Sequence, residues 1–346
     1  GLATAEVHMI VVGRNGLACR RQGVGVDQQG VVAGAGALNP CWCHAHALKA
    51  KLHGDRGADG RAVAGGNEKH LGVFGGGGLG KGELGVVIAP TGAGKSMVLV
   101  HLGTKALKEG KTVIQYTLEL QDTVIANRYD SCLTGYPLSD IITFKEEIYE
   151  QISELDGKLI IKEYPTASAH SGHVRHLLQE LDLKRSFKPD IIFVDYLNIC
   201  ASFRIRPGSN MNTYTYVKAI AEEFRGLAVE FNVPIMSATQ TTRSGFVSTD
   251  VGLEDTSESF GLPATADLMF ALISTEELEQ LNQMLVKQLK NRYNDPTVNK
   301  RFIIGIDRAK MKLYDVSQSA QEDLVDTGQE DTDMAEVEDR FKDFKV

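Results

Sequence analysis

The feature that most constrains this chain is the stretch from Glu83 to Ser96, an apolar run followed directly by a glycine-rich turn. The run from Leu84 to Ala89 is continuously apolar, which is typical of a strand buried on both faces of a parallel sheet. The residues after Ser96 predict a helix that ends at Gly110. A strand, a tight turn and a helix in this order predict a ligand-binding loop at one edge of a sheet.

The turn has the spacing of a P-loop, with alanine where the strict motif has its first glycine: Ala89, Pro90, Thr91, Gly92, Ala93, Gly94, Lys95 and Ser96. Gly92 and Gly94 allow the backbone to curl so that its N–H groups face an anion. The helix that opens there adds the positive end of its dipole. Lys95 is expected to reach the β- and γ-phosphates of ATP, and the Ser96 hydroxyl to bind Mg²⁺. The alternative is a glycine-rich turn that binds nothing.

Strand and helix patterns alternate along the rest of the chain. Helices are predicted at residues 121–133, 140–153, 171–185 and 213–231. Strands are predicted at residues 112–118, 158–164, 190–195, 233–239, 267–273, 284–290, 302–307 and 311–316. This alternation predicts an α/β fold, a mainly parallel twisted sheet with right-handed crossovers and helices on both faces. The short connections between the last four strands indicate an antiparallel edge.

Three polar residues stand at the carboxyl ends of predicted strands, where ligands bind in parallel sheets. Asp195 ends the run Ile191 to Val194, a Walker B pattern, and its carboxylate can hold Mg²⁺ through the water shell of the ion. Glu119 could accept a proton from the water that attacks the γ-phosphate. The Gln240 amide can sense the γ-phosphate and pass the change to the following loop. Each could instead be an ordinary polar strand end, but together they follow the P-loop in the required order.

Composition divides the chain into three parts. Residues 1–80 contain 19 of the 35 glycines and show no lasting helix or strand period, so we expect an irregular leader, disordered or artefactual. Residues 81–317 form the regular α/β domain. Residues 318–346 hold ten Asp and Glu against three Lys and Arg, which is −7 of the total −8, and predict a disordered acidic tail. The rest is almost neutral, so any nucleic-acid binding would have to come from local loops.

The cysteines and the hydropathy indicate the compartment of the protein and bear on whether it has a zinc site or a membrane span. Cys132 and Cys200 lie in apolar contexts and are expected as buried thiols of a reducing compartment. The segment 41–46, Cys-Trp-Cys-His-Ala-His, is too compact for its four ligands to surround one zinc ion. No apolar run approaches ~18 residues, so no membrane span is predicted.

Several segments resemble the motor domain of DnaB-type hexameric replicative helicases. They are residues 89–96, 117–120, 192–197 and 237–240, and the longer strings 194–202, 217–223 and 261–267 resemble the helicases of T4-like phages. The resemblance covers about residues 82–317. It implies a RecA-like core and a homo-hexameric ring that uses ATP and Mg²⁺ to move 5′ to 3′ on single-stranded DNA and unwind forked duplex. It also implies a primase and a helicase loader as partners, in the cytoplasm of a bacterial or phage-infected cell.

The same resemblance gives a role to two basic residues. Helicases of this family carry a Lys-x-Arg near the last strands that reaches the ATP site of the neighbouring subunit, and Lys290 and Arg292 match it. An arginine supplied in this way neutralises charge that develops on the γ-phosphate. We expect the strand that carries Arg292 to lie at the far edge of the sheet from the P-loop, too far from its own nucleotide. The alternative is a solvated strand end.

Loops that face the channel of such a ring would contact DNA. Arg204 and Arg206 lie in the loop 202–210, and Arg243 follows Gln240. Cations on loops suit contacts to phosphate without sequence preference. Ordinary surface arginines are the alternative.

Two other functions share the P-loop core. A RecA-type recombinase would form filaments on DNA, and a nucleotide-gated assembly switch would use ATP to control its oligomeric state. The string 261–267 and the placement of Lys290 and Arg292 favour the helicase over the recombinase. ATPase activity stimulated by DNA would exclude the switch, and strand displacement on a fork would exclude the recombinase.

Overall fold

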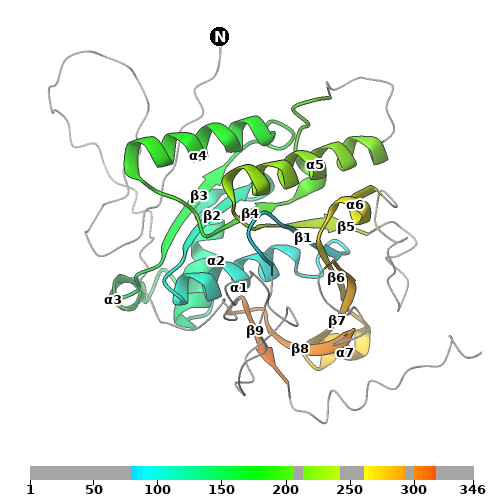
Figure 1. Ribbon diagram of the computed structural model, residues 1–346. Helices are drawn as coiled ribbons and strands as arrows, with labels where there is room; N and C mark the ends of the chain where they lie inside the picture. Colours follow the sequence, from blue (N-terminus) through cyan, green and yellow to red (C-terminus); the bar gives the residue numbers. More distant parts are fainter. Residues whose placement is uncertain (1–78, 206–212, 242–260, 293–299, 317–346) are drawn as a thin grey trace, which may run out of the picture.

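Figure 1 shows the computed structural model of the chain, which describes residues 79–205, 213–241, 261–292 and 300–316. The predicted leader before Leu79, the acidic tail 318–346, and both Arg206 and Arg243 lie outside these residues. The described residues form a mixed sheet with helices on both faces, and the predicted α/β fold is therefore confirmed.

The sheet has nine strands among the described residues. In spatial order they are β3 (Lys158–Glu163), β2 (Thr112–Thr117), β4 (Ile191–Asp195), β5 (Ile235–Gln240), β1 (Leu84–Ala89), β6 (Leu268–Ile273), β7 (Gln283–Asn291), β8 (Arg301–Asp307) and β9 (Lys312–Asp315). The first six of these pair in parallel, and β7, β8 and β9 extend the sheet in antiparallel fashion. β1 lies at the centre and is buried at every position, as its apolar run predicts.

Helices cover the two faces of this sheet. One face carries α1 (Lys95–Lys108), α2 (Asp122–Thr134) and α3 (Lys145–Ser153), and the other carries α4 (Ser171–Arg185) and α5 (Thr213–Phe231) (Figure 1). Short helices η1 (Leu197–Ile199), α6 (Gly261–Thr265) and α7 (Glu276–Gln280) lie in the connections. Successive strand residues alternate between two apolar cores: Val87 packs on the α1 side and Val86 on the α5 side. None of the helices among the described residues is long and apolar enough to cross a membrane.

Three details differ from the sequence predictions. β6 pairs in parallel with β1, so the antiparallel edge begins one strand later than expected. The helix predicted from residue 140 begins at Lys145, because the amides of Thr143 and Phe144 close turns onto the Asp140 carbonyl. The helix α6 was not predicted; its Pro263 is tolerated because the first turn of a helix needs no N–H from that residue.

Because the strands β1 to β6 are parallel, all of them begin on one side of the sheet and end on the opposite side. We call the carboxyl edge the side where β1, β2, β4 and β5 end, and the amino edge the side where β1 and β6 begin. β7 runs against β6, so its end at Asn291 pairs with Leu268 at the amino edge. The prediction that the strand of Arg292 lies at the far edge of the sheet is wrong, since only β6 separates β7 from β1. Arg292 is instead kept from its own P-loop by the length of β1, about 20 Å for a six-residue strand.

Candidate nucleotide-binding site

The loop between β1 and α1 has the backbone that a phosphate-binding turn requires. Gly92 and Gly94 have φ angles of 82° and 99°, in the left-handed region that favours glycine. Ala89 replaces the first glycine of the strict motif, yet it is the buried last residue of β1 and has no positive φ, so the replacement fits. Gly94 offers no capping side chain and the first turn of α1 has no acidic residue. The N-terminal N–H groups of α1 are therefore left for an anion.

The Lys95 side chain folds back over this loop. Its Nζ donates to the carbonyl oxygens of Ala89 at 3.3 Å and Pro90 at 2.9 Å. Burial lowers the pKa of Lys95, while the negative charges of Glu119 and Asp195 act in the opposite direction. Its contacts are to neutral carbonyls, and a phosphate oxygen would be the stronger acceptor for the ammonium.

The Asp195 carboxylate is buried at the end of β4. The residue is 1% exposed, and neither carboxylate oxygen makes a hydrogen bond of normal geometry with the described residues. Burial raises the pKa of Asp195, although the Ser96 hydroxyl is close enough to favour the charged form. The described residues contain no cluster of three or more His, Cys, Asp or Glu side chains that could hold a metal. One unpartnered carboxylate beside one hydroxyl fits Mg²⁺, which binds few protein groups and takes its other ligands from water and phosphate.

Glu119 lies just beyond the end of β2 and is exposed to solvent. Its charge acts on the pKa of both Lys95 and Asp195, which places it at the same carboxyl edge. Arg128 of α2 lies close enough to interact with both carboxylates: burial lowers the pKa of its guanidinium, and the charges of Asp195 and then Glu119 raise it. Sequence reasoning missed Arg128, because an arginine in a helix nine residues after Glu119 carries no motif of its own.

Gln240 ends β5, in register with Ala89 at the end of β1. Its Nε2 donates to the Tyr196 hydroxyl at 2.8 Å, and the Tyr196 ring centroid lies 5.7 Å from Lys95 Nζ. Burial and the charges of nearby carboxylates raise the pKa of Tyr196. Tyr196 therefore links Gln240 to the P-loop lysine. Its position directly after Asp195 was the available signal, and the sequence analysis did not use it.

Lys290 and Arg292 lie at the amino edge, away from the other candidates. Lys290 Nζ donates to the carbonyls of Pro263 and Ala264 in α6. Arg292 Nε forms an ion pair with Asp267 at 2.9 Å. The prediction that these two residues serve another subunit is compatible with this placement.

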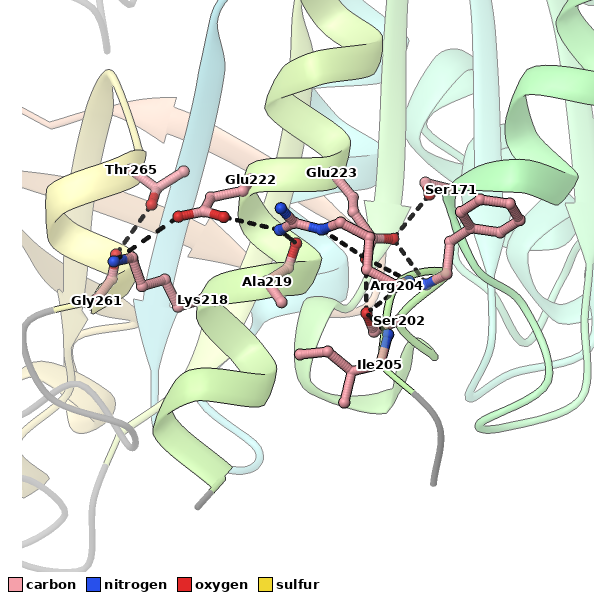
Figure 2. A network of polar contacts seen from close by, with 11 residues as sticks. Ser171, Ser202, Arg204, Ile205, Lys218, Ala219, Glu222, Glu223, Gly261 and Thr265 are labelled. Atoms are coloured by element: carbon pink, nitrogen blue, oxygen red, sulfur yellow. Dashed lines mark hydrogen bonds and ion pairs between the residues drawn. The ribbon is translucent and has the colours of Figure 1, made fainter. Parts of the chain in front are cut away.

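Arg204 of the candidate DNA loop contacts α5, as Figure 2 shows. Its Nη2 donates to Glu222 at 2.7 Å and to the Ala219 carbonyl at 3.0 Å, and its Nε lies 3.5 Å from Glu223. Glu223 also accepts hydrogen bonds from the Ser202 hydroxyl at 2.6 Å and from the Arg204 amide at 3.2 Å. The Arg204 side chain remains 51% exposed. Its contact with DNA stays a prediction.

The chain matches a known family and known relatives. The model of the DnaB-like helicase C-terminal domain matches residues 75–308. A DnaB-like replicative helicase of Enterobacteria phage T4 is 42% identical over 253 residues, which are 70% of this chain and 53% of that protein. A replicative DNA helicase DnaB of Mycoplasma genitalium is 27% identical over 207 residues, 57% of this chain and 43% of that protein. The chain thus spans about half the length of the curated relatives it matches.

Two solved structures share the fold. The ATPase domain of G40P has a TM-score of 0.58 at 16% identity and covers 68% of this chain and 86% of that domain. A DnaB-like replicative helicase, solved in a study of its interactions with primase, also has a TM-score of 0.58, at 15% identity, covering 69% of this chain and 60% of that chain. These likenesses support the α/β fold described above. The match of the family model over residues 75–308, two thirds of the chain, shows that the chain belongs to the DnaB-like helicase C-terminal domain family.

Proposed function

We propose that the chain is the motor of an ATP-driven replicative DNA helicase. The observation that carries the proposal is the Asp195 carboxylate, buried with no hydrogen-bond partner among the described residues, beside Ser96 and an uncapped P-loop helix. Such a group costs free energy unless a ligand completes it. Membership of the DnaB-like family supports Mg²⁺ and ATP as that ligand.

Each side chain at the carboxyl edge then has a role in hydrolysis. Lys95 would leave its two carbonyls to bind the β- and γ-phosphates. Ser96 and Asp195 would hold Mg²⁺, which supplies positive charge against the phosphates when bound. Glu119, the exposed carboxylate, would orient the attacking water and accept its proton. Gln240 would respond to the γ-phosphate through its hydrogen bond with Tyr196.

The amino edge would complete the site of another subunit. Arg292 is held about one strand length from its own P-loop, so a second copy of the chain must present a nucleotide to it. A ring of six copies, as the family resemblance implies, would satisfy this at every interface. Lys290 would add a second positive charge beside Arg292.

The DNA and protein partners are proposed from what is implied by the resemblance to the family. We propose single-stranded and forked DNA as the track, with 5′-to-3′ movement, and the loops carrying Arg204, Arg206 and Arg243 as contacts. A primase partner is proposed by analogy with the DnaB-like helicase solved in a study of its interactions with primase. A helicase loader is proposed from the family resemblance alone. We propose the cytoplasm of a bacterial or phage-infected cell as the location, because one relative is the helicase of a bacterial virus.

The decisive experiment measures ATP hydrolysis and strand displacement by the full chain with Mg²⁺. We expect single-stranded DNA to stimulate ATPase activity, and a fork with a free 5′ tail to be unwound. The Lys95→Ala chain controls for a contaminating ATPase, and chelation of Mg²⁺ should stop both activities. Hydrolysis indifferent to DNA would favour the assembly switch. Stimulated hydrolysis with filaments on DNA and no displacement would favour the recombinase.

A further inference from the structure

The amino edge is organised by one buried carboxylate, that of Asp267, which lies between α6 and β6. Its side chain is 0% exposed. Its Oδ2 accepts the Leu84 amide at 3.0 Å, and its own amide donates to the Leu84 carbonyl at 2.8 Å. Asp267 is therefore fixed to the first residue of β1, the strand that ends in the P-loop.

Two arginines from distant parts of the chain share this carboxylate. Arg225 of α5 binds both oxygens, through Nε at 2.9 Å and Nη2 at 3.0 Å. Arg292 binds Oδ1 through Nε at 2.9 Å. With Lys290 nearby, the described residues of the cluster are three cations and one anion, an excess of two positive charges. Such an excess suits an anion that arrives from outside the subunit.

The Arg292 guanidinium is held through its Nε, while its terminal nitrogens remain available to another ligand. Nε is occupied by Asp267, and the contacts of Nη2 within the described part of the chain are long ones, of 3.3 and 3.4 Å, to the carbonyls of Ala264 and Ala266. Nη1 makes no hydrogen bond with the described residues, and the side chain is 38% exposed. A planar guanidinium fixed through Nε still offers its terminal nitrogens to a phosphate.

We propose that Asp267 is the positioning residue of Arg292: it orients the guanidinium so that the terminal nitrogens meet the γ-phosphate bound by a neighbouring copy of the chain. This inference rests on the proposed function in trans. Such positioning would favour hydrolysis, because the Arg292 side chain loses its rotamer entropy on folding and does not have to lose it in the transition state. The alternative is that the ion pair with Asp267 holds Arg292 in an inactive position, away from the nucleotide of the neighbouring copy.

The test is a double-mutant cycle in DNA-stimulated ATPase activity, with ring formation and thermal melting measured on every variant. Asp267→Asn should lower kcat about 10²-fold with KM for ATP within about 3-fold, because the arginine is present but misplaced. Asp267→Asn/Arg292→Ala should be no slower than Arg292→Ala alone, since a positioning residue has nothing to position once the arginine is absent. If the double variant were slower than Arg292→Ala by the same factor by which Asp267→Asn is slower than the parent, the two residues would act independently and the proposal would be overturned. Faster turnover by Asp267→Asn would also overturn it, because that result is expected if Asp267 holds Arg292 in an inactive position.

Arg225→Ala is the matched control, since it removes a partner of the same carboxylate without touching Arg292. We expect its kcat to stay within about 3-fold of the parent even if its melting temperature falls, because Asp267 keeps Arg292. A kcat as low as that of Asp267→Asn would mean that the cluster acts only by supporting the fold.

A second variant keeps the inference testable if Asp267→Asn does not fold. Arg292→Lys keeps the charge but loses Nε, so its ammonium cannot serve Asp267 and a phosphate in the same geometry. We expect its kcat within about tenfold of Arg292→Ala. Parent-like turnover by Arg292→Lys would overturn positioning. Parent-like turnover by Arg292→Ala would instead overturn the proposed role in trans.

Discussion

Asp195 and Asp267 are both 1% exposed, and they stand at opposite edges of the same sheet. Asp195 has no hydrogen-bond partner among the described residues for either carboxylate oxygen, whereas Asp267 is bound by a backbone amide and two arginines. Burial of a carboxylate is costly in both places. Asp267 is compensated by direct contacts within the fold, whereas the nearby Ser96, Arg128 and Lys95 only partly offset the burial of Asp195, whose pKa stays raised. The carboxyl edge is thus built to be completed by a ligand, and the amino edge is built to present groups that are already fixed.

This difference follows from the direction of the strands. Side chains at the carboxyl ends of β1, β2, β4 and β5 converge around a helix N-terminus, which attracts anions. At the amino edge, β7 returns antiparallel and brings its cations to the last carbonyls of α6, which lack partners within the helix. In the proposed ring, each subunit would supply Arg292 to one neighbour and receive the Arg292 of another.

The largest expected effect is the loss of the phosphate-binding lysine. Lys95→Ala should reduce ATP hydrolysis to background while the protein stays folded, because within the fold the Lys95 ammonium contacts two loop carbonyls and the face of the Tyr196 ring, and none of these needs it for packing. Steady-state hydrolysis and circular dichroism check this. Normal turnover by the folded variant would remove the P-loop assignment, and with it the comparison of the two edges.

The next effect tests whether the two edges serve different subunits. Arg292→Ala should lower kcat about 10³- to 10⁵-fold, the range for an arginine supplied to a phosphoryl-transfer site. Mixed with Glu119→Gln protein, it should regain partial activity, because some interfaces then pair an intact Glu119 with an intact Arg292. A mixture no more active than its parents, in rings shown to be mixed, would mean that Arg292 acts within its own subunit or not at all.

Glu119→Gln alone should bind ATP normally and hydrolyse it at least ~100-fold more slowly, the usual scale for a lost general base. Binding is measured by equilibrium titration with ATP, and turnover under single-turnover conditions. If ATP binding fails instead, Glu119 contributes to holding the metal, and the division of roles at the carboxyl edge must be redrawn.

The carboxyl edge was predicted from the sequence because its signals are local. The P-loop, Asp195 and Glu119 each stand next to the strand that places them, and the predicted bounds of α4 and α5 match those of the structure. The amino edge was not predicted, because its contacts join residues 25 to 183 positions apart, as between Asp267 and Leu84. Asp267 meets Arg292 only because β7 runs beside β6, and no periodic pattern specifies strand order.

Arg128 and Tyr196 illustrate a second limit. Both lie close to the site, yet their residue types are common in helices and after strands, and their roles depend on which neighbours the fold supplies. Arg204 was predicted as a DNA contact from its place in a loop, and the sequence did not indicate that α5 supplies Glu222 and Glu223 as its partners.

A stability measurement compares the two aspartates directly. Without Mg²⁺ and nucleotide, Asp195→Asn should leave the free energy of unfolding unchanged or raise it by about 1 kcal/mol, because the burial cost of the Asp195 charge exceeds what Ser96, Arg128 and Lys95 return. Asp267→Asn should lower it by about 3 kcal/mol, because two arginines lose the charge that they share. Urea denaturation measures both values. Equal changes would show that the two carboxylates have similar environments in solution.

The smallest expected effect concerns the link between the sensor and the loop. Tyr196→Phe keeps the ring near Lys95 but removes the hydroxyl that accepts the Gln240 amide at 2.8 Å. One hydrogen bond of about 0.5–1.5 kcal/mol corresponds to roughly a 2- to 12-fold change in rate. We therefore expect DNA-stimulated hydrolysis to fall several-fold, with ATP binding and DNA-independent hydrolysis nearly unchanged.

The control for this prediction is the other partner of the hydrogen bond. Gln240→Ala should give the same defect, and the double variant should be no worse, because both changes break one contact. If Tyr196→Phe weakened ATP binding instead, the tyrosine would act through Lys95. The carboxyl edge would then be organised partly by contacts within the fold, and not only by the ligand that the buried Asp195 carboxylate calls for.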